Sequence, residues 1–151
     1  MNLTRYIIHR KDGGIEIMSC VDDARPETEI QKWTKSRRDE IAKVGRVVKD
    51  NEIPQDRAFR NAWCCNGKAI EHDMGKAREI HRDRLRAKRA DKMAELDVAY
   101  MRADEAGDAA AKSAIAAKKQ ALRDVTDHPD IEAAKTSSDL KKVWPEGLGL
   151  D

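Results

Sequence analysis

Aromatic side chains are scarce in this 151-residue chain, where Phe, Trp and Tyr together make up 4% of the residues and charged residues make up 38%. Because so few bulky apolar groups cannot fill a thick globular interior, we expect a thin, extended architecture. The length suits one domain of ordinary size, or a small head with a helical arm, and is too short for two full cores.

Long apolar runs and an excess of charge of one sign are also lacking. No stretch approaches the roughly 20 apolar residues that cross a bilayer, and residues 1–5 lack the pattern of a signal peptide. We therefore expect no membrane segment and a cytoplasmic protein. The 30 basic and 28 acidic residues give a net charge of +2, so any attraction of nucleic acid has to be local.

Cysteine is rare, with Cys20, Cys64 and Cys65 as an odd set. Adjacent cysteines seldom bridge each other, so we expect reduced thiols. His72 and His81 follow Cys64 and Cys65, but structural zinc normally needs separated ligand pairs such as C-x-x-C. No metal, cofactor or enzymatic activity is expected, since Ser/His/Asp groupings, phosphate loops and H-E-x-x-H are all lacking.

The β-rich residues gather in the first third of the chain. Residues 6–8 and 15–18 flank a Lys-Asp-Gly-Gly turn, which predicts a β-hairpin. A helix is expected to begin at Pro26, with acidic residues in its first turn, and residues 44–48 predict a third strand. We predict a small N-terminal α+β head over residues 1–50.

Residues 51–71 are expected to form a linker with a short aromatic helix. Phe59 and Trp63 are spaced i, i+4, so their rings share one face of that helix. Two interpretations stay open. The rings fill the junction between head and arm, or they face a partner protein, since aromatic residues are common anchors at interfaces.

Good helix formers dominate residues 72–126, interrupted only by the Ala-Gly-Asp sequence at 106–108. Each helix carries a narrow apolar stripe, formed by Met93, Leu96, Tyr100 and Ala103 on the first and by Ala111, Ile115, Leu122 and Val125 on the second. These stripes predict a long antiparallel helical hairpin, followed by short helices and a tail over residues 127–151. The expected fold class is mainly α with the small N-terminal α+β head.

The first half of the long helix is locally basic, with eight Lys or Arg residues and three acidic ones between Lys76 and Lys92. No aromatic residue is interleaved for base stacking, and the basic residues are spread around the helix. A solvated face, or a surface for acidic subunits, is favoured over DNA binding. With the two aromatic residues, the candidate partner-binding residues are Phe59, Trp63, Arg78, Arg82, Arg86 and Arg89.

Several short motifs give a more specific indication. They are Ile-Pro at 53–54, Phe-Arg-Asn-Ala-Trp at 59–63, Ala-Arg-Glu-Ile at 77–80 and Lys-Gln-Ala-Leu-Arg-Asp at 119–124. With them the chain resembles small proteins encoded in tailed-bacteriophage genomes, including the tail assembly chaperones. The resemblance implies a structural protein of the virion tail or neck, docking between tail subunits or attaching fibres to the tail.

The same resemblance implies other tail or fibre proteins as partners, and several copies in a symmetric assembly. The protein would be located in the virion tail, and in the host cytoplasm during assembly. Two alternatives stay open, namely a non-virion assembly chaperone for a tail or fibre protein and a DNA-binding accessory protein that uses residues 76–92. Nucleic acid is not the expected partner.

Overall fold

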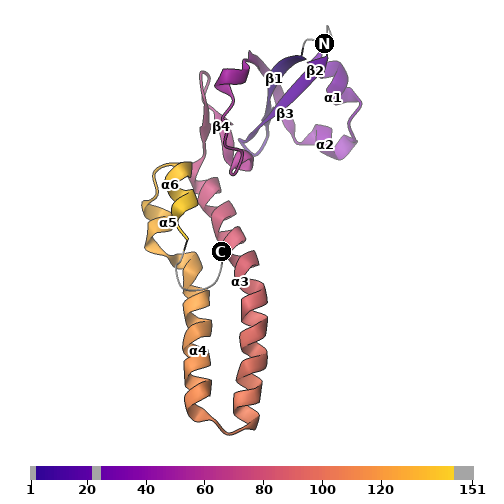
Figure 1. Ribbon diagram of the computed structural model, residues 1–151. Helices are drawn as coiled ribbons and strands as arrows, with labels where there is room; N and C mark the ends of the chain where they lie inside the picture. The colour runs from indigo at the N-terminus through magenta and orange to yellow at the C-terminus, as the bar shows by residue number, and fades with distance from the viewer. Residues whose placement is uncertain (1–2, 22–24, 145–151) are drawn as a thin grey trace. The chain divides into compact units, whose positions relative to one another are not determined.

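The computed structural model describes residues 3–21 and 25–144. Of the described residues, 57% are helical and 21% lie in strands. The chain divides into two compact units, residues 1–73 (unit 1) and 74–151 (unit 2), and Figure 1 labels their elements.

Unit 1 is built on an antiparallel sheet in which β1 is the central strand, in the order β2-β1-β3. The strands are β1 (Leu3–Arg10), β2 (Ile15–Val21) and β3 (Ile41–Val48). Ile7 pairs with Ile17 across the first turn, where Gly13 has a φ of 81° that glycine adopts without strain. The predicted β-hairpin and third strand are confirmed.

Both faces of this sheet are covered. Successive side chains of a strand point to opposite faces, and Ile7 and Ile8 are both fully buried. Ile7 packs with Ile53 and Trp63, from the segment that follows β3. The helices of unit 1 are α1 (Pro26–Gln31) and α2 (Lys35–Asp39). They contact β2 and β3 respectively, and α1 begins at the predicted proline.

The predicted short aromatic helix is wrong. The segment contains the 3-10 turns η1 (Asp50–Glu52) and η2 (Arg60–Ala62) and the two-stranded sheet of β4 (Trp63–Cys65) and β5 (Ile70–His72). Phe59 has a φ of −116° and a ψ of 35°, outside the helical region, and Trp63 already pairs with His72 as a strand residue. The strand pairing and the burial of Trp63 against Ile7 outweigh the local helical preference.

Unit 2 begins with one long helix, and the predicted helix over this part of the chain is confirmed. Its elements are α3 (Met74–Glu105), α4 (Ala109–Asp124), η3 (Val125–Asp127), α5 (Pro129–Ala133) and α6 (Ser137–Lys142). After α3, Gly107 takes a left-handed φ of 68°. Asp108 then caps α4 by accepting a hydrogen bond from the backbone N–H of Ala111 at 2.9 Å.

The prediction of a long antiparallel helical hairpin in a mainly α fold is wrong. Only α3 is long, with 32 residues, whereas α4 has 16 and gives way to η3, α5 and α6, of which η3 and α6 also contact α3. Of the predicted stripe on the first helix, Met93, Leu96 and Tyr100 are only half-buried. The chain is α+β. Unit 1 contains the two sheets, and in unit 2 shorter helices pack against one long helix.

The short helices of unit 2 each bury one large apolar side chain, namely Leu122 from α4, Ile131 from α5 and Leu140 from α6. Thr136 caps α6, because its hydroxyl accepts the backbone N–H of Asp139 at 3.0 Å. The tail predicted at the end of residues 127–151 lies outside the described residues.

Candidate functional site

The two aromatic residues among the candidate partner-binding residues, Phe59 and Trp63, are both buried. Phe59 is 1% exposed and Trp63 is 5% exposed. The indole Nε1 of Trp63 donates to Nε2 of His72 at 3.2 Å, and burial lowers the pKa of His72, so its ring is neutral and can accept. Both side chains are therefore buried, and Trp63 packs with Ile7 and Ile53 in the core of unit 1.

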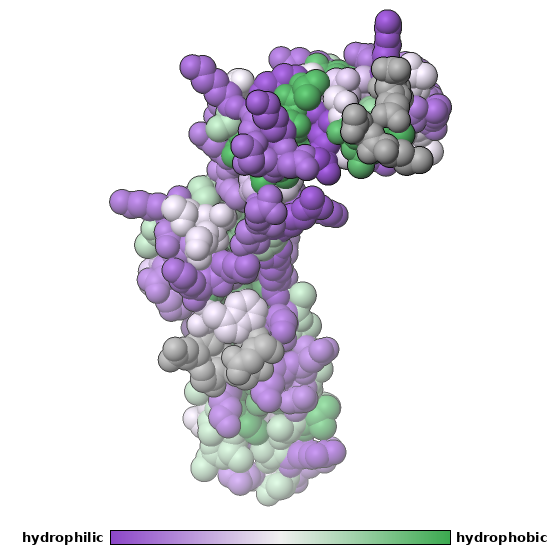
Figure 2. Space-filling view, turned by 45° about the horizontal axis from the view of Figure 1, so that its top comes forward, coloured by the Kyte–Doolittle hydropathy of each residue, from purple (hydrophilic) through white to green (hydrophobic). Residues whose placement is uncertain are grey.

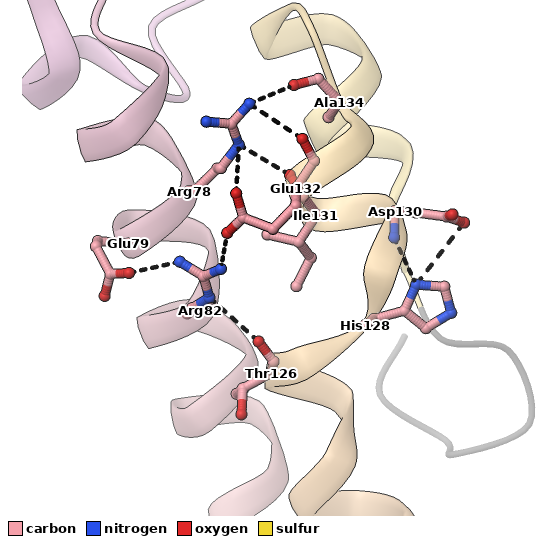
Figure 3. Close-up of polar contacts among 9 residues, drawn as sticks. All are labelled: Arg78, Glu79, Arg82, Thr126, His128, Asp130, Ile131, Glu132 and Ala134. Atoms are coloured by element: carbon pink, nitrogen blue, oxygen red, sulfur yellow. Dashed lines mark hydrogen bonds and ion pairs between the residues drawn. The ribbon is translucent and has the colours of Figure 1, made fainter.

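Arg78, also a predicted partner-binding residue, is engaged inside unit 2 (Figure 3). Its guanidinium donates to the carbonyl oxygens of Ile131, Glu132 and Ala134 at 3.0, 3.2 and 3.0 Å. The last carbonyls of a helix have no partner within the helix. Arg78 therefore satisfies the C-terminal end of α5 from a position on α3.

Arg82 lies one turn further along α3 and contacts η3, the 3-10 turn that precedes α5 (Figure 3). It donates to the carbonyl oxygen of Thr126 at 3.2 Å and pairs with Glu79 at 2.5 Å and with Glu132. The bond to Glu132 raises the pKa of Arg82, so the group stays charged and the pair helps to hold α5 against α3.

Arg89 does the same for α4, since it donates to the carbonyl oxygens of Leu122 and Arg123 at 3.1 and 2.9 Å. Arg86 differs, because its side chain is 47% exposed and pairs with Asp83 on its own helix at 2.7 Å. The structure thus places three of the four predicted arginines in contacts within unit 2 and leaves Arg86 on the surface.

A second group of arginines, which the sequence analysis missed, lines a cleft in unit 1. The cleft has a volume of about 400 Å³. Its arginines are Arg5 and Arg10 on β1, Arg37 on α2, and Arg57 and Arg60 before β4. Ile15, Ile53 and Trp63, all buried, also line it. These arginines are far apart in the sequence, so only the folded chain brings them together.

Internal ion pairs hold three of these arginines. Arg10 pairs with Asp12 at 2.6 Å and with Glu16 at 3.7 Å, and the bond to Asp12 raises its pKa. Arg37 lies 3.4 Å from Glu16 and its guanidinium is 3.7 Å from the ring centroid of Trp33. Arg5 pairs with Asp50.

Arg57 and Arg60 are exposed. Among residues 3–21 and 25–144, no carboxylate forms an ion pair with either guanidinium. The nearby carboxylate of Asp56 accepts the backbone N–H of Ala58 at 2.8 Å. This side of the cleft therefore offers two guanidinium groups for an anionic ligand.

None of the three cysteines is among the residues that line the cleft. Cys64 and Cys65 are neighbours on β4, so their side chains point to opposite faces. Burial raises the pKa of Cys20, which keeps it a thiol.

In the described part of the chain, no three His, Cys, Asp or Glu side chains are placed to share a metal ion. None of the described helices combines the length and apolar character needed to cross a membrane.

Comparison with known proteins gives no template for either unit. No family model, no curated protein and no solved structure matches the chain. The function proposed below is therefore argued from the exposed surface of α3 and from the short motifs of the sequence.

Proposed function

We propose that this chain is a structural protein of a phage tail or neck that docks against neighbouring protein subunits. The observation that carries this proposal is an apolar stripe on the exposed side of α3. Its members share one helix face at 3-4-4-3 spacing and are all exposed, namely Ala87, Ala90, Ala94, Val98 and Met101. Val98 is 43% exposed and Met101 is 57% exposed.

Apolar surface continues around the end of unit 2. Figure 2 shows green and pale green side chains gathered where α3 joins α4. The alanines at 109, 110, 116 and 117 are exposed there. A contiguous apolar strip on a highly charged chain is typical of a surface that another protein covers.

The charges beside the stripe fit a parallel α3 helix of a second copy. In a parallel helix pair, a residue on one flank of the seam faces the residue five positions later on the partner helix. Here that spacing joins side chains of opposite sign, namely Glu79 with Arg84, Arg86 with Asp91 and Asp97 with Arg102. This pattern supports the expectation of several copies in a symmetric assembly.

The resemblance of the short motifs to phage proteins supports the biological setting. Mass spectrometry of particles purified from the phage that encodes the chain tests it, and we expect peptides of this protein in amounts comparable to known tail subunits. Absence from the particles would remove the structural role. Absence combined with co-purification of a fibre or tape-measure protein from lysate would favour the assembly chaperone.

The DNA-binding alternative gains no support from the long helix. Arg78, Arg82 and Arg89 already donate to carbonyl oxygens of unit 2, so their guanidinium groups are not available to phosphates. We expect no binding of duplex DNA by these residues even at low salt, where phosphate contacts are strongest.

A further inference from the structure

We propose that the arginine-lined cleft of unit 1 binds a short acidic peptide segment with an apolar residue at its centre, contributed by a neighbouring protein. This inference rests on the proposed docking function and names the kind of partner that one surface accepts. Five arginines line the cleft, against one acidic residue, Glu16. The whole chain carries a net charge of only +2, so positive charge is concentrated at this site.

The arginines of the cleft play two different parts. Arg10 and Arg37 share the carboxylate of Glu16, and Arg5 is held by Asp50. These pairs fix the side chains in place before any ligand arrives, which lowers the entropic cost of binding. The carboxylates of Glu16 and Asp50 also neutralise much of the positive charge of Arg5, Arg10 and Arg37.

Arg57 and Arg60 provide the charge that a ligand can use. They lie three positions apart, with Arg60 at the start of η2 and Arg57 before it, and both are exposed. No carboxylate in the described ranges forms an ion pair with either. A guanidinium presents parallel N–H donors that match the two oxygens of a carboxylate. Two such groups suit a segment with two or more acidic residues.

The apolar lining selects a peptide over a nucleotide. Ile17, which is half-buried, and the small exposed parts of Ile15, Ile53 and Trp63 lie in the cleft wall, where an aliphatic side chain between the acidic groups can contact them. Trp63 is 5% exposed, so it offers no open ring face on which a base could stack. A volume of about 400 Å³ holds a few residues of peptide.

Fluorescence anisotropy on the full chain tests this inference, with the labelled peptide Glu-Asp-Leu-Asp-Glu as probe and Gln-Asn-Leu-Asn-Gln as its neutral counterpart. We expect the acidic peptide to bind and the neutral one to bind at least about 30-fold more weakly. The double variant R57E/R60E should weaken binding of the acidic peptide by about 30-fold or more.

A matched control is available in K43E/K68E, which changes the net charge equally at two exposed residues of unit 1 that do not line the cleft. It should weaken binding by less than about 3-fold, an effect of long-range charge only. Circular dichroism of both variants confirms that they fold.

Three results would overturn the inference: no binding of the acidic peptide, equal losses in the two double variants, or displacement of the peptide by millimolar inorganic phosphate. Its failure is distinguishable from failure of the proposed function. A chain found in particles that does not bind the peptide loses only this inference, and a chain that binds the peptide but is absent from particles loses only the virion role.

Discussion

The guanidinium of Arg78 donates to the carbonyl oxygen of Ala134 at 3.0 Å, across 56 positions of the sequence. Arg78 lies on α3, a helix whose many charged residues predict a solvated face. Ala134 follows the last turn of α5. One charged side chain therefore completes the hydrogen bonding of a helix end that its own turn cannot satisfy.

Replacing Arg78 by alanine should lower the free energy of unfolding of unit 2 by about 2–3 kcal/mol, because three carbonyl oxygens lose a charged donor. Urea denaturation followed by circular dichroism at 222 nm measures the change. Arg86→Ala removes only an exposed pair on the same helix and should cost about 0.5 kcal/mol or less. Equal effects of the two substitutions would contradict the capping role.

Phe59→Ala should destabilise unit 1 by about 3–5 kcal/mol, since a side chain that is 1% exposed leaves a cavity when it is truncated. Phe59→Leu keeps most of the volume and should cost about 1 kcal/mol. Thermal unfolding of both variants provides the measurement. A Phe59→Ala protein as stable as the wild type would mean that the ring serves a partner and not the core.

The sequence was informative where a local signal decides the structure. A glycine turn predicted the hairpin, Pro26 marked the start of α1, and the helix formers predicted α3. It failed where distant residues decide. Trp63 becomes a strand residue because His72 pairs with it, and α4 stops halfway along α3, where the chain turns to bury Val125 and Ile131.

The candidate site was the least predictable part, for the same reason. The cleft arginines come from positions 5 to 60 and meet only after the sheet, α2 and the segment before β4 have packed. Arginines along one helix formed a visible cluster in the sequence, yet the partners of Arg78 lie more than 50 positions away. The spacing of residues in the sequence cannot show that a side chain on one helix will reach the C-terminal carbonyl groups of a distant helix.

Acidification should destabilise unit 2 through His81. Its ring is 2% exposed and its Nε2 donates to the carbonyl oxygen of Val143 at 2.7 Å. Burial, assisted by the charge of Arg84, lowers the pKa of His81 below its ordinary value of about 6.5. The unfolded chain therefore takes up the proton first as the pH falls, so the stabilisation is complete above that value and is lost below it.

The variant H81Q keeps a donor for the Val143 carbonyl but cannot titrate. Between pH 7 and pH 5, its free energy of unfolding should fall less steeply than that of the wild type. Urea denaturation across this range compares the two slopes. His9 and His72 also have pKa values lowered by burial, so a residual slope from unit 1 is expected, and identical slopes would exclude a contribution from His81.

The exposed stripe on α3 should matter for association and not for folding. The variant V98Q/M101Q should change the free energy of unfolding by about 0.5 kcal/mol or less, because both side chains are exposed. Sedimentation velocity at rising concentration should show self-association of the wild type and weaker association of this variant. A wild type that stays monomeric at the highest concentrations would argue against α3 pairing.

The most direct test of the docking role is cross-linking mass spectrometry on purified phage particles, using an amine-reactive linker. Lys88 and Lys92 are exposed and lie within the same stretch of α3 as the stripe, on another face of the helix that the linker can still reach. If the chain docks in the tail or neck, these lysines should cross-link to another copy of the chain or to a different tail protein. Particles that contain the chain but yield only cross-links within single copies of it would contradict the account.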